Sequence, residues 1–419
     1  MRKFDVIIIG AGAAGLMAAL QLKRENPNIA AVILEKALRP GKKLLATGGG
    51  RCNIANRRAG KAYYFTASGH NPAFVQPALA AYPVADNLAF FANLGLLTKE
   101  EEDGKIYPMG DQAAAVLDVL RLQAAANGVS IFTETEVTAL APGWHIITTQ
   151  GSFTARAIIL TPGGVASPQL GTAGNFAQLM APLGHKTTRL YPALTQLKCQ
   201  SNFHKALQGV KFTGKATLWQ KNTRLAEAAG EVLFTSYGLS GPPILQLSRL
   251  AAMNYPQPPQ PEITVQLDLL PAFTIEEIRA DLARRRALPF TLEDTLSGLL
   301  NKRLGQQLFK LSTSKKLSAA ASSLTDAEIN TLAANIKSLT LTVSGVCGWR
   351  EAQVMAGGLS LDQFDPKTLG SRLAPGLFAA GEVLDICGSC GGYNLSWAWS
   401  SGRLAAHSAA LYLKEGENA

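Results

Sequence analysis

At 419 residues, with 47% hydrophobic and 17% charged residues, the chain is too long for one ordinary core and too apolar for a disordered protein. Five scattered cysteines exclude a small disulfide-rich scaffold, and five histidines show no metal-ligand spacing. With no apolar stretch near the ~18 residues of a membrane span, we expect a cytoplasmic protein of two or three domains, without metal or membrane association.

The predicted elements begin with a strand, a glycine turn and a helix. Residues 4–9 form an apolar run, interrupted only at Asp5, that is typical of a strand buried on both faces of a parallel sheet. A helix is expected over about 13–23 and a second strand over 31–34, ended by Glu35. This order predicts a βαβ unit.

The turn of this unit has the glycine spacing of a dinucleotide-binding site. Gly10 permits a tight turn, Gly12 lets the backbone approach a phosphate, and Gly15 allows close helix packing. Glu35 lies 20 residues beyond Gly15, where a carboxylate can accept hydrogen bonds from ribose hydroxyls. Because Glu35 would repel a 2′-phosphate, the pattern favours FAD or NAD over NADP at this site.

The middle of the chain changes character twice. Strands are expected near 129–133, 136–139, 145–149 and 157–160, with a helix over 112–126. From about residue 191, shorter alternating strands and the proline-rich stretch 256–261 predict an antiparallel β-rich insert. From Thr274 to about Lys337 the period is helical, with Thr274 and Thr325 as expected N-caps, before a short β run at 339–343.

The C-terminal region repeats the strand, turn and helix. Residues 376–380 predict a strand, Gly381-Glu382 can approach the ribityl and phosphate region of a long cofactor, and Gly391-Gly392 open a helix near Asn394. Two such units at opposite ends of the chain indicate one cofactor contacted at both ends, which favours FAD over the shorter NAD. Amides at the second helix start would stabilise the negative charge of a reduced flavin.

Three motifs resemble those of one bacterial flavoprotein family, and together they span the chain. They are Gly41–Asn53 (GKKLLATGGGRCN), Gly230–Pro242 (GEVLFTSYGLSGP) and Gly391–Ala398 (GGYNLSWA). The family is that of the NAD(P)/FAD-dependent oxidoreductases, whose members include aminoacetone oxidase, a BaiN-like bile-acid-pathway reductase and ribosomal RNA dihydrouridine synthase. The resemblance implies an α/β fold, with a glutathione-reductase-like FAD-binding Rossmann domain interrupted by a β-barrel-like insert and a helical insert.

The expected domain boundaries follow from the composition shifts together with this resemblance. They are 1–190 with 345–419 for the FAD-binding domain, 191–270 with 337–344 for the β-rich insert, and 271–336 for the helical insert.

The resemblance also implies the contacts of the adenosine half of FAD. Ala14 and Gly15 would meet the pyrophosphate, Glu35 the adenosine ribose, and the backbone of Val137 the adenine.

For the flavin half, Arg51, Cys52 and the preceding glycines would lie along the ring. Glu382 and Leu395 would close over its ribityl and pyrimidine portions. The expected cofactor-binding residues are, in full, Gly10, Gly12, Ala14, Gly15, Glu35, Lys36, Gly49, Gly50, Arg51, Cys52, Val137, Gly163, Gly381, Glu382, Gly392, Tyr393, Asn394 and Leu395.

The net charge of +10 raises the hypothesis of a polyanionic partner. Basic residues concentrate in the predicted helical insert, at Arg279, Arg284, Arg285, Arg286, Lys302, Arg303, Lys310, Lys315 and Lys316. We therefore expect ribosomal RNA as a partner held through this insert, although a solvated charged face is the simpler alternative. The oligomeric state is not predicted.

Four functions remain open at this point. The first is an NAD(P)H-driven reductase of a conjugated C=C, with uridine in ribosomal RNA slightly preferred as substrate. The alternatives are a small-molecule enone or steroid-type reductase, an FAD-dependent oxidase of a small amine such as aminoacetone, and a non-catalytic flavin-binding protein. Because no second GxGxxG follows a strand, NAD(P)H would dock transiently as co-substrate, or oxygen would reoxidise the flavin.

No catalytic residue is assigned, although Tyr393, Tyr191 and Arg51 are candidate neighbours of a substrate. The pair Cys387 and Cys390 departs from the family pattern. It is interpreted either as a redox dithiol beside the flavin or, more simply, as two small residues filling a tight loop.

Overall fold

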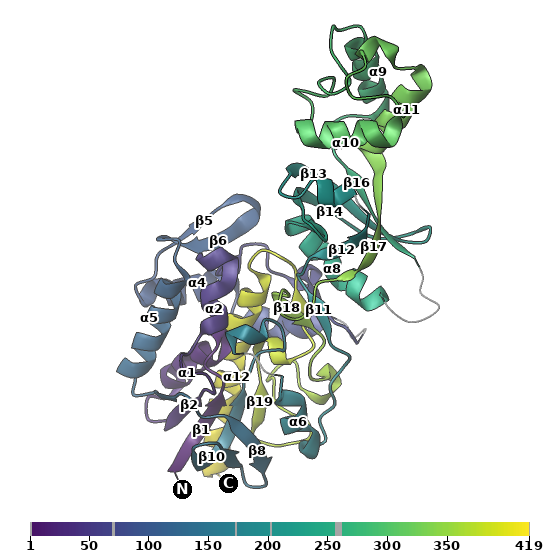
Figure 1. Ribbon diagram of the computed structural model, residues 1–419. Helices are drawn as coiled ribbons and strands as arrows, with labels where there is room; N and C mark the ends of the chain where they lie inside the picture. The colour runs from purple at the N-terminus through teal and green to yellow at the C-terminus, as the bar shows by residue number, and fades with distance from the viewer. Residues whose placement is uncertain (1, 69–71, 172–173, 202, 256–261, 419) are drawn as a thin grey trace. The chain divides into compact units, whose positions relative to one another are not determined.

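Two compact units divide the chain, one of residues 1–191 with 354–419 and one of residues 192–353. The computed structural model describes residues 2–68, 72–171, 174–201, 203–255 and 262–418 (Figure 1). The predicted proline-rich connector at 256–261 lies outside the described residues. Both glycine motifs therefore fall within the first unit, although most of the chain separates them.

A mostly parallel sheet forms the centre of the first unit, in the order β7-β2-β1-β10-β9-β8 with β19 also paired to β10. Its strands are β1 (Arg2–Ile9), β2 (Ala31–Leu34), β7 (Ser130–Phe132), β8 (Val137–Ala141), β9 (His145–Thr148), β10 (Gly151–Leu160) and β19 (Leu377–Ala379). Strands β1 and β19 both pair in parallel with β10, whereas β8 and β9 form an antiparallel meander. The sheet confirms the predicted Rossmann-type order and brings the C-terminal strand beside the N-terminal ones.

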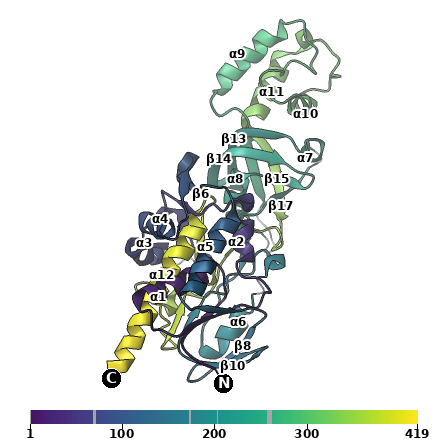
Figure 2. The same ribbon diagram turned by 90° about the vertical axis from the view of Figure 1, so that its left-hand side faces the viewer.

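Helices α1 (Ala13–Glu25) and α12 (Tyr393–Asn418) lie side by side in the first unit, as Figures 1 and 2 both show. The contact is close because Gly402 of α12 faces the start of α1, where a Cβ on Gly402 would stand 2.5 Å from the carbonyl oxygen of Ala14. The helix after the Gly10–Gly15 turn is thereby packed directly against the helix after Gly391-Gly392.

Shorter elements complete this unit. The helices are α2 (Lys42–Ala46), α3 (Gln76–Ala81), α4 (Val84–Asn93), α5 (Ala113–Ala126) and α6 (Phe176–Met180). The strands are β3 (Ala55–Asn56), β4 (Tyr64–Phe65), β5 (Thr98–Glu100), β6 (Lys105–Pro108), β18 (Val354–Ala356) and β20 (Cys387–Gly388), while β11 (Tyr191–Ala193) leads out of the unit. None of the helices in the described part of the chain is both long enough and apolar enough to span a membrane.

The second unit contains a closed antiparallel barrel in the order β12-β15-β14-β13-β16-β17. Its strands are β12 (Leu197–Gln200), β13 (Lys211–Gln220), β14 (Thr223–Phe234), β15 (Gly238–Ser240), β16 (Ile263–Asp268) and β17 (Leu339–Val346), with α7 (Phe203–Ala206) and α8 (Pro242–Asn254) in the same unit. Buried positions alternate with more accessible, mostly half-buried positions along β16 and β17, as expected for strands with one face in a core. The predicted β-barrel-like insert is confirmed.

Three helices, α9 (Ile275–Arg286), α10 (Lys302–Ser312) and α11 (Asp326–Ser338), form the predicted helical insert. Their buried side chains belong to the same apolar cluster as those of the barrel, and the amide of Leu269 donates to the carbonyl of Ile336 at 3.0 Å. The barrel and the helices therefore share one core, and the boundaries expected between these two inserts stay a prediction.

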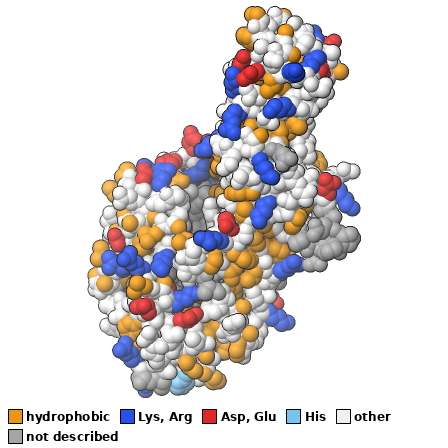
Figure 3. All heavy atoms as spheres, in the orientation of Figure 1, with side chains coloured by type: hydrophobic (Ala, Val, Ile, Leu, Met, Phe, Trp, Pro, Cys, Tyr) orange, Lys and Arg blue, Asp and Glu red, His pale blue; other side chains and the backbone are white. Residues whose placement is uncertain are grey.

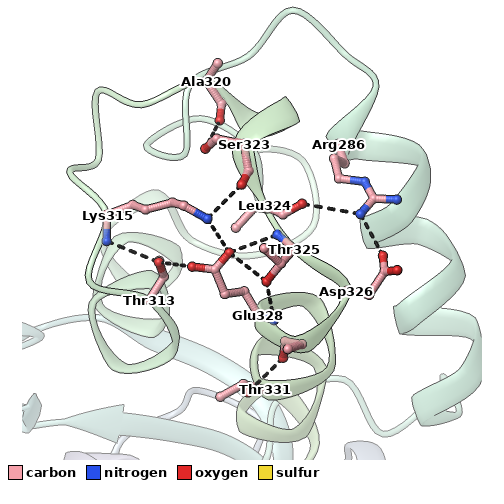
Figure 4. Close-up of polar contacts among 11 residues, drawn as sticks. Arg286, Thr313, Lys315, Ala320, Ser323, Leu324, Thr325, Asp326, Glu328 and Thr331 are labelled. Carbon is pink, nitrogen blue, oxygen red and sulfur yellow. Dashed lines mark hydrogen bonds and ion pairs between the residues drawn. The ribbon is translucent and has the colours of Figure 1, made fainter.

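Both expected N-caps of these helices are confirmed as capping boxes. The Thr325 hydroxyl accepts from the Glu328 amide at 3.2 Å, and the Glu328 carboxylate accepts from the Thr325 amide at 2.9 Å; Thr274 and Glu277 do the same for α9. Glu328 also pairs with Lys315 and accepts from Thr313, as Figure 4 shows. These bonds, that from Lys315 most strongly, lower the pKa of Glu328 from 4.5 to about 2.

Replacing Glu328 with glutamine is expected to lower the free energy of unfolding at pH 7 by about 1–2 kcal/mol, because the ion pair with Lys315 is lost and the remaining bonds are no longer charge-assisted, although glutamine can still complete the capping box. Since the folded pKa is depressed, the carboxylate stabilises the fold above pH 4.5, and this contribution is lost as the pH falls from 4.5 towards 2. Urea midpoints of the wild type and Glu328→Gln should therefore converge at low pH. Glu277→Gln is the matched control, because Glu277 forms the same kind of capping box but no ion pair among the described residues, and it should change the midpoint less.

Candidate functional site

The first glycine motif forms a tight turn at the carboxyl end of β1. Gly10 has φ +102°, and a Cβ there would stand 2.4 Å from the Thr161 carbonyl oxygen; a Cβ on Gly15 would stand 2.0 Å from the Gly10 oxygen. At Gly12, by contrast, no atom of the described residues lies within 4 Å of an added Cβ. No side chain caps the α1 amides that follow Gly12. The turn therefore combines two crowded glycines with one open glycine at a helix N-terminus, which suits a bound phosphate.

A second segment supports this turn from β10. The Thr161 hydroxyl donates to the carbonyls of Ile9 and Gly10, both at 3.0 Å. Gly163 follows two residues later with φ +76°. The predicted candidate Gly163 thus lies directly after the residue that fixes the Gly10 turn.

Glu35 is held at the end of β2 beside the same turn. Its carboxylate accepts from the amide of Ala11 and from the amide of Ala37, both at 2.8 Å. The Glu35 backbone in turn bonds to Thr135, since the Thr135 amide donates to the Glu35 carbonyl at 2.9 Å. The carboxylate therefore has a fixed orientation, suited to accept from a ribose.

Lys36 and Val137 lie at this same end of the site. Burial lowers the pKa of Lys36, while the charges of Glu136 and Glu35 oppose that shift. Val137 is buried, two residues beyond Thr135. The structure thus assembles the predicted adenosine-side residues from two separate stretches of chain.

The glycine run Gly48–Gly50, which belongs to the Gly41–Asn53 motif, leaves bare backbone facing open space. Gly48, Gly49 and Gly50 in η1 (Thr47–Gly50) all have positive φ, and no atom of the described residues lies within 4 Å of a Cβ added to Gly49 or Gly50. Such a surface fits the approach of a flat ring. Cys52, also at positive φ, is fully buried, and burial raises its pKa to about 11, so its thiol stays protonated and packs rather than acting as a nucleophile.

The Arg51 side chain forms ion pairs with neighbouring acidic residues. Its guanidinium donates to Asp111 at 2.6 and 3.0 Å and to Glu101 at 2.5 Å, and it stacks over the Tyr107 ring with 4.0 Å to the centroid. The Glu101 and Asp111 bonds raise the pKa of Arg51. Only the backbone of Arg51 is therefore left for the predicted role along a cofactor.

The glycine segment at Gly381, near the C-terminal end of the chain, packs directly against the Gly10–Gly15 turn. A Cβ on Gly381, which has φ +75°, would stand 3.0 Å from the Cβ of Ala14. Glu382, in η9 (Gly381–Val383), accepts from the amide of Met355 at 2.8 Å and pairs with Lys43 at 2.6 Å. The two ends of the chain thus lie side by side at this turn, and their joint role in binding one cofactor stays a prediction.

The double glycine Gly391-Gly392 before α12 packs against Ala55, which lies just after the Gly41–Asn53 motif. A Cβ on Gly392, at φ +95°, would stand 2.4 Å from the Ala55 carbonyl oxygen. Asn394 closes its own loop, since its side chain accepts from the Gly388 amide at 2.8 Å and donates to the Gly388 carbonyl at 3.0 Å. Leu395 is half-buried in the first turn of the helix. The Asn394 side chain is therefore already hydrogen-bonded within its own loop, and this role is more direct than the predicted contact with a ligand.

Tyr393 begins α12 as part of an aromatic group. Its ring stacks on Tyr63 with 4.5 Å between centroids, and the Tyr64 hydroxyl donates to its carbonyl at 2.9 Å. Burial raises the pKa of Tyr393 to about 12, so this phenol is neutral at physiological pH. Tyr63 and Tyr64 carried no recognisable pattern in the sequence.

Cys387 and Cys390 are not joined by a disulfide bond. Cys387 is buried, and burial raises the pKa of Cys390, which disfavours the thiolate that a redox dithiol requires. The simpler interpretation, small residues in a tight loop, fits this environment better.

The predicted basic face of the helical insert is largely neutralised. Residues 271–336 contain nine basic but also seven acidic residues. Six of the nine cations pair with acids: Arg279 with Glu276, Arg284 and Arg285 with Asp281, Arg286 with Asp326, Lys302 with Asp294, and Lys315 with Glu328. Figure 3 shows the blue and red side chains interspersed there. The ion pairs weaken the argument from charge alone, and ribosomal RNA as a partner held through this insert stays a prediction.

The fold and the site together define a dinucleotide-binding domain of the Rossmann type, because an open glycine turn follows β1, Glu35 is fixed beside that turn, and the glycine segment at Gly381 packs against it. A family model of the HI0933-like protein Rossmann domain matches residues 4–408, and the chain belongs to this family.

Several known proteins resemble the chain over nearly its full length. The 3-dehydro-bile acid delta(4,6)-reductase of Clostridium scindens is 38% identical over 408 residues, covering 96% of this chain and 98% of that protein. The ribosomal RNA dihydrouridine synthase of Escherichia coli is 28% identical, with 96% of each chain covered. The synthase of Haemophilus influenzae is 29% identical over 94% of this chain and 96% of that one.

Among solved structures, the 3-ketosteroid delta1-dehydrogenase of Sterolibacterium denitrificans superposes with a TM-score of 0.51 at 14% identity, covering 98% of this chain and 100% of that one. This likeness shows the shared fold. The family and the 38% identical reductase identify the chain as an FAD-dependent oxidoreductase.

Proposed function

We propose that this chain uses NAD(P)H to reduce a carbon–carbon double bond conjugated to a carbonyl group. The observation that carries the proposal is the bond type shared by its relatives. The C. scindens protein is named for reducing double bonds of a 3-dehydro-bile acid, and dihydrouridine differs from uridine by saturation of a ring C=C next to a carbonyl. Two relatives with very different substrates thus share one reaction.

The described residues can be given roles in this reaction, and these roles are part of the proposal. The Gly10–Gly15 turn and the first amides of α1 would hold the pyrophosphate, Glu35 the ribose, and Lys36 and Val137 the adenine side. Bound FAD would supply hydride transfer at its N5. The N-terminus of α12 after Gly392 would place the positive end of a long helix beside the flavin, stabilising negative charge there.

The electron donor is proposed as NAD(P)H that binds only transiently, because no second glycine fingerprint follows a strand. Mixing the protein anaerobically with NADH or NADPH should bleach the flavin absorbance, while small amines should not. Rapid bleaching by an amine, with peroxide released in air, would instead support an amine oxidase.

Two substrate classes fit this bond chemistry. Uridine in ribosomal RNA is supported by the two relatives named as dihydrouridine synthases. A small conjugated ketone is supported by the 38% identical relative, and also by the paired cations of the helical insert, which weaken the charge argument for RNA.

A direct comparison separates these classes. The anaerobically reduced protein is mixed either with a 4-en-3-one steroid or with a ribosomal RNA transcript, and flavin reoxidation is followed by absorbance. The productive substrate should reoxidise the flavin and gain two hydrogens by mass spectrometry. Failure of both substrates, together with unchanged dihydrouridine in ribosomal RNA from cells lacking the gene, would contradict the proposal.

A further inference from the structure

An ion pair joins two of the site motifs from opposite ends of the chain. The Lys43 ammonium lies 2.6 Å from a Glu382 carboxylate oxygen, and both side chains are mostly shielded, with 23% and 18% of their surfaces exposed. The other Glu382 oxygen accepts from the buried Met355 amide at 2.8 Å. Both carboxylate oxygens therefore have a fixed partner.

The pair is built into the cofactor site. Lys43 is the second residue of α2, and the amide of the N-cap residue Gly41 donates to the Ala11 carbonyl of the phosphate turn at 3.0 Å. Glu382 follows Gly381, which contacts Ala14 of the same turn. A Cβ on Gly164 would stand only 3.0 Å from the Glu382 carboxyl carbon, so the acid has little room to turn away. Both members of the pair are thus fixed beside the turn proposed to hold the pyrophosphate.

We propose that Lys43 is a positioning residue for FAD: its charge neutralises Glu382, so that this carboxylate can lie close to the negatively charged pyrophosphate without repelling it. The inference rests on the FAD site but not on the proposed substrate or electron donor. A shielded carboxylate next to phosphates is unfavourable because low-dielectric surroundings strengthen like-charge repulsion. Lys43 acts through Glu382, and its removal leaves that repulsion uncompensated.

The test measures FAD affinity, with no substrate present. Apoprotein of each variant is titrated with FAD, and Kd is obtained from quenching of flavin fluorescence. Lys43→Met is expected to raise Kd about tenfold or more, the loss that follows when one partner of a shielded ion pair is removed. Lys43→Arg, which keeps the charge, should stay within about threefold of the wild type. Lys42→Met, in the neighbouring residue of the same helix, is the matched control and should leave Kd unchanged.

The decisive comparison is the double variant. Because Glu382→Gln removes the uncompensated charge, Lys43→Met with Glu382→Gln should bind FAD more tightly than Lys43→Met alone. If Lys43→Met apoprotein does not fold, the double variant is compared with Glu382→Gln, and their Kd values should agree within about threefold.

Wild-type affinity in Lys43→Met would overturn the proposal. So would a double variant that binds no better than Lys43→Met while the melting temperature of the apoprotein falls in both, since this would indicate a merely structural pair. Either result leaves C=C reduction untouched, because that reaction is tested separately with substrate.

Discussion

Replacing Gly15 with alanine is expected to destabilise the protein and to abolish FAD binding, whereas Gly12→Ala should bind FAD at least about tenfold more weakly and keep its stability. A Cβ on Gly15 would stand 2.0 Å from the Gly10 carbonyl oxygen and 2.7 Å from the Thr161 hydroxyl, so the turn must move. Overpacking of this kind costs about 1–3 kcal/mol. The flavin absorbance of purified protein and urea unfolding of the apoprotein measure the two effects.

Gly12→Ala is the matched control, because it adds the same methyl group at a position that other described residues do not crowd. It has φ −83°, which alanine adopts without strain, and its Cβ would point into space that no described residue fills. The apoprotein should unfold within about 0.5 kcal/mol of the wild type. FAD binding should weaken by about tenfold or more, since a methyl group would occupy the space proposed for phosphate. Normal FAD content in Gly12→Ala would contradict the phosphate assignment.

Replacing Arg403 with alanine is expected to destabilise the first unit by about 3 kcal/mol or more. Only 5% of Arg403 is exposed, and its guanidinium donates to the side-chain oxygens of Gln21 at 2.9 Å and Asn87 at 3.1 Å. It also lies over the Tyr82 ring, 4.2 Å from the centroid. Truncation would leave two buried acceptors without this donor and a cavity among three helices, α1, α4 and α12.

Urea unfolding followed by tryptophan fluorescence provides the measurement. Lys414→Ala, an exposed position on the same helix, should unfold like the wild type. Arg403→Met, which fills the space without the charge, should fall between the two. An Arg403→Ala midpoint equal to that of Lys414→Ala would show that the buried guanidinium contributes nothing to stability.

The sequence was most informative where structure depends on near neighbours along the chain. The order of strand, glycine turn and helix near Gly10 was predictable because apolar periodicity and the need for positive φ are local properties. The caps at Thr274 and Thr325 were predictable for the same reason, since each capping box joins residues three positions apart. The Rossmann-type sheet, the barrel insert and the helical insert follow from such local patterns, together with the family resemblance.

Charge pairing lay outside what the sequence could predict. The basic run near Arg286 suggested a surface for RNA, yet Arg286 pairs with Asp326, 40 residues away. Arg51 stands beside the glycine run, but its side chain is held by Glu101 and Asp111.

By itself, then, the sequence determined two units of strand, glycine turn and helix, and predicted that they bind one long cofactor, because backbone conformation and apolar periodicity depend on short segments. Only the tertiary structure decided which charges remain available and which side chains meet. Lys43 and Glu382 are 339 residues apart and share no pattern, but the packing of α2 and η9 against the Gly10–Gly15 turn brings them to 2.6 Å. The reason is physical: electrostatic interactions depend on distance in space, and folding sets that distance after local structure has formed.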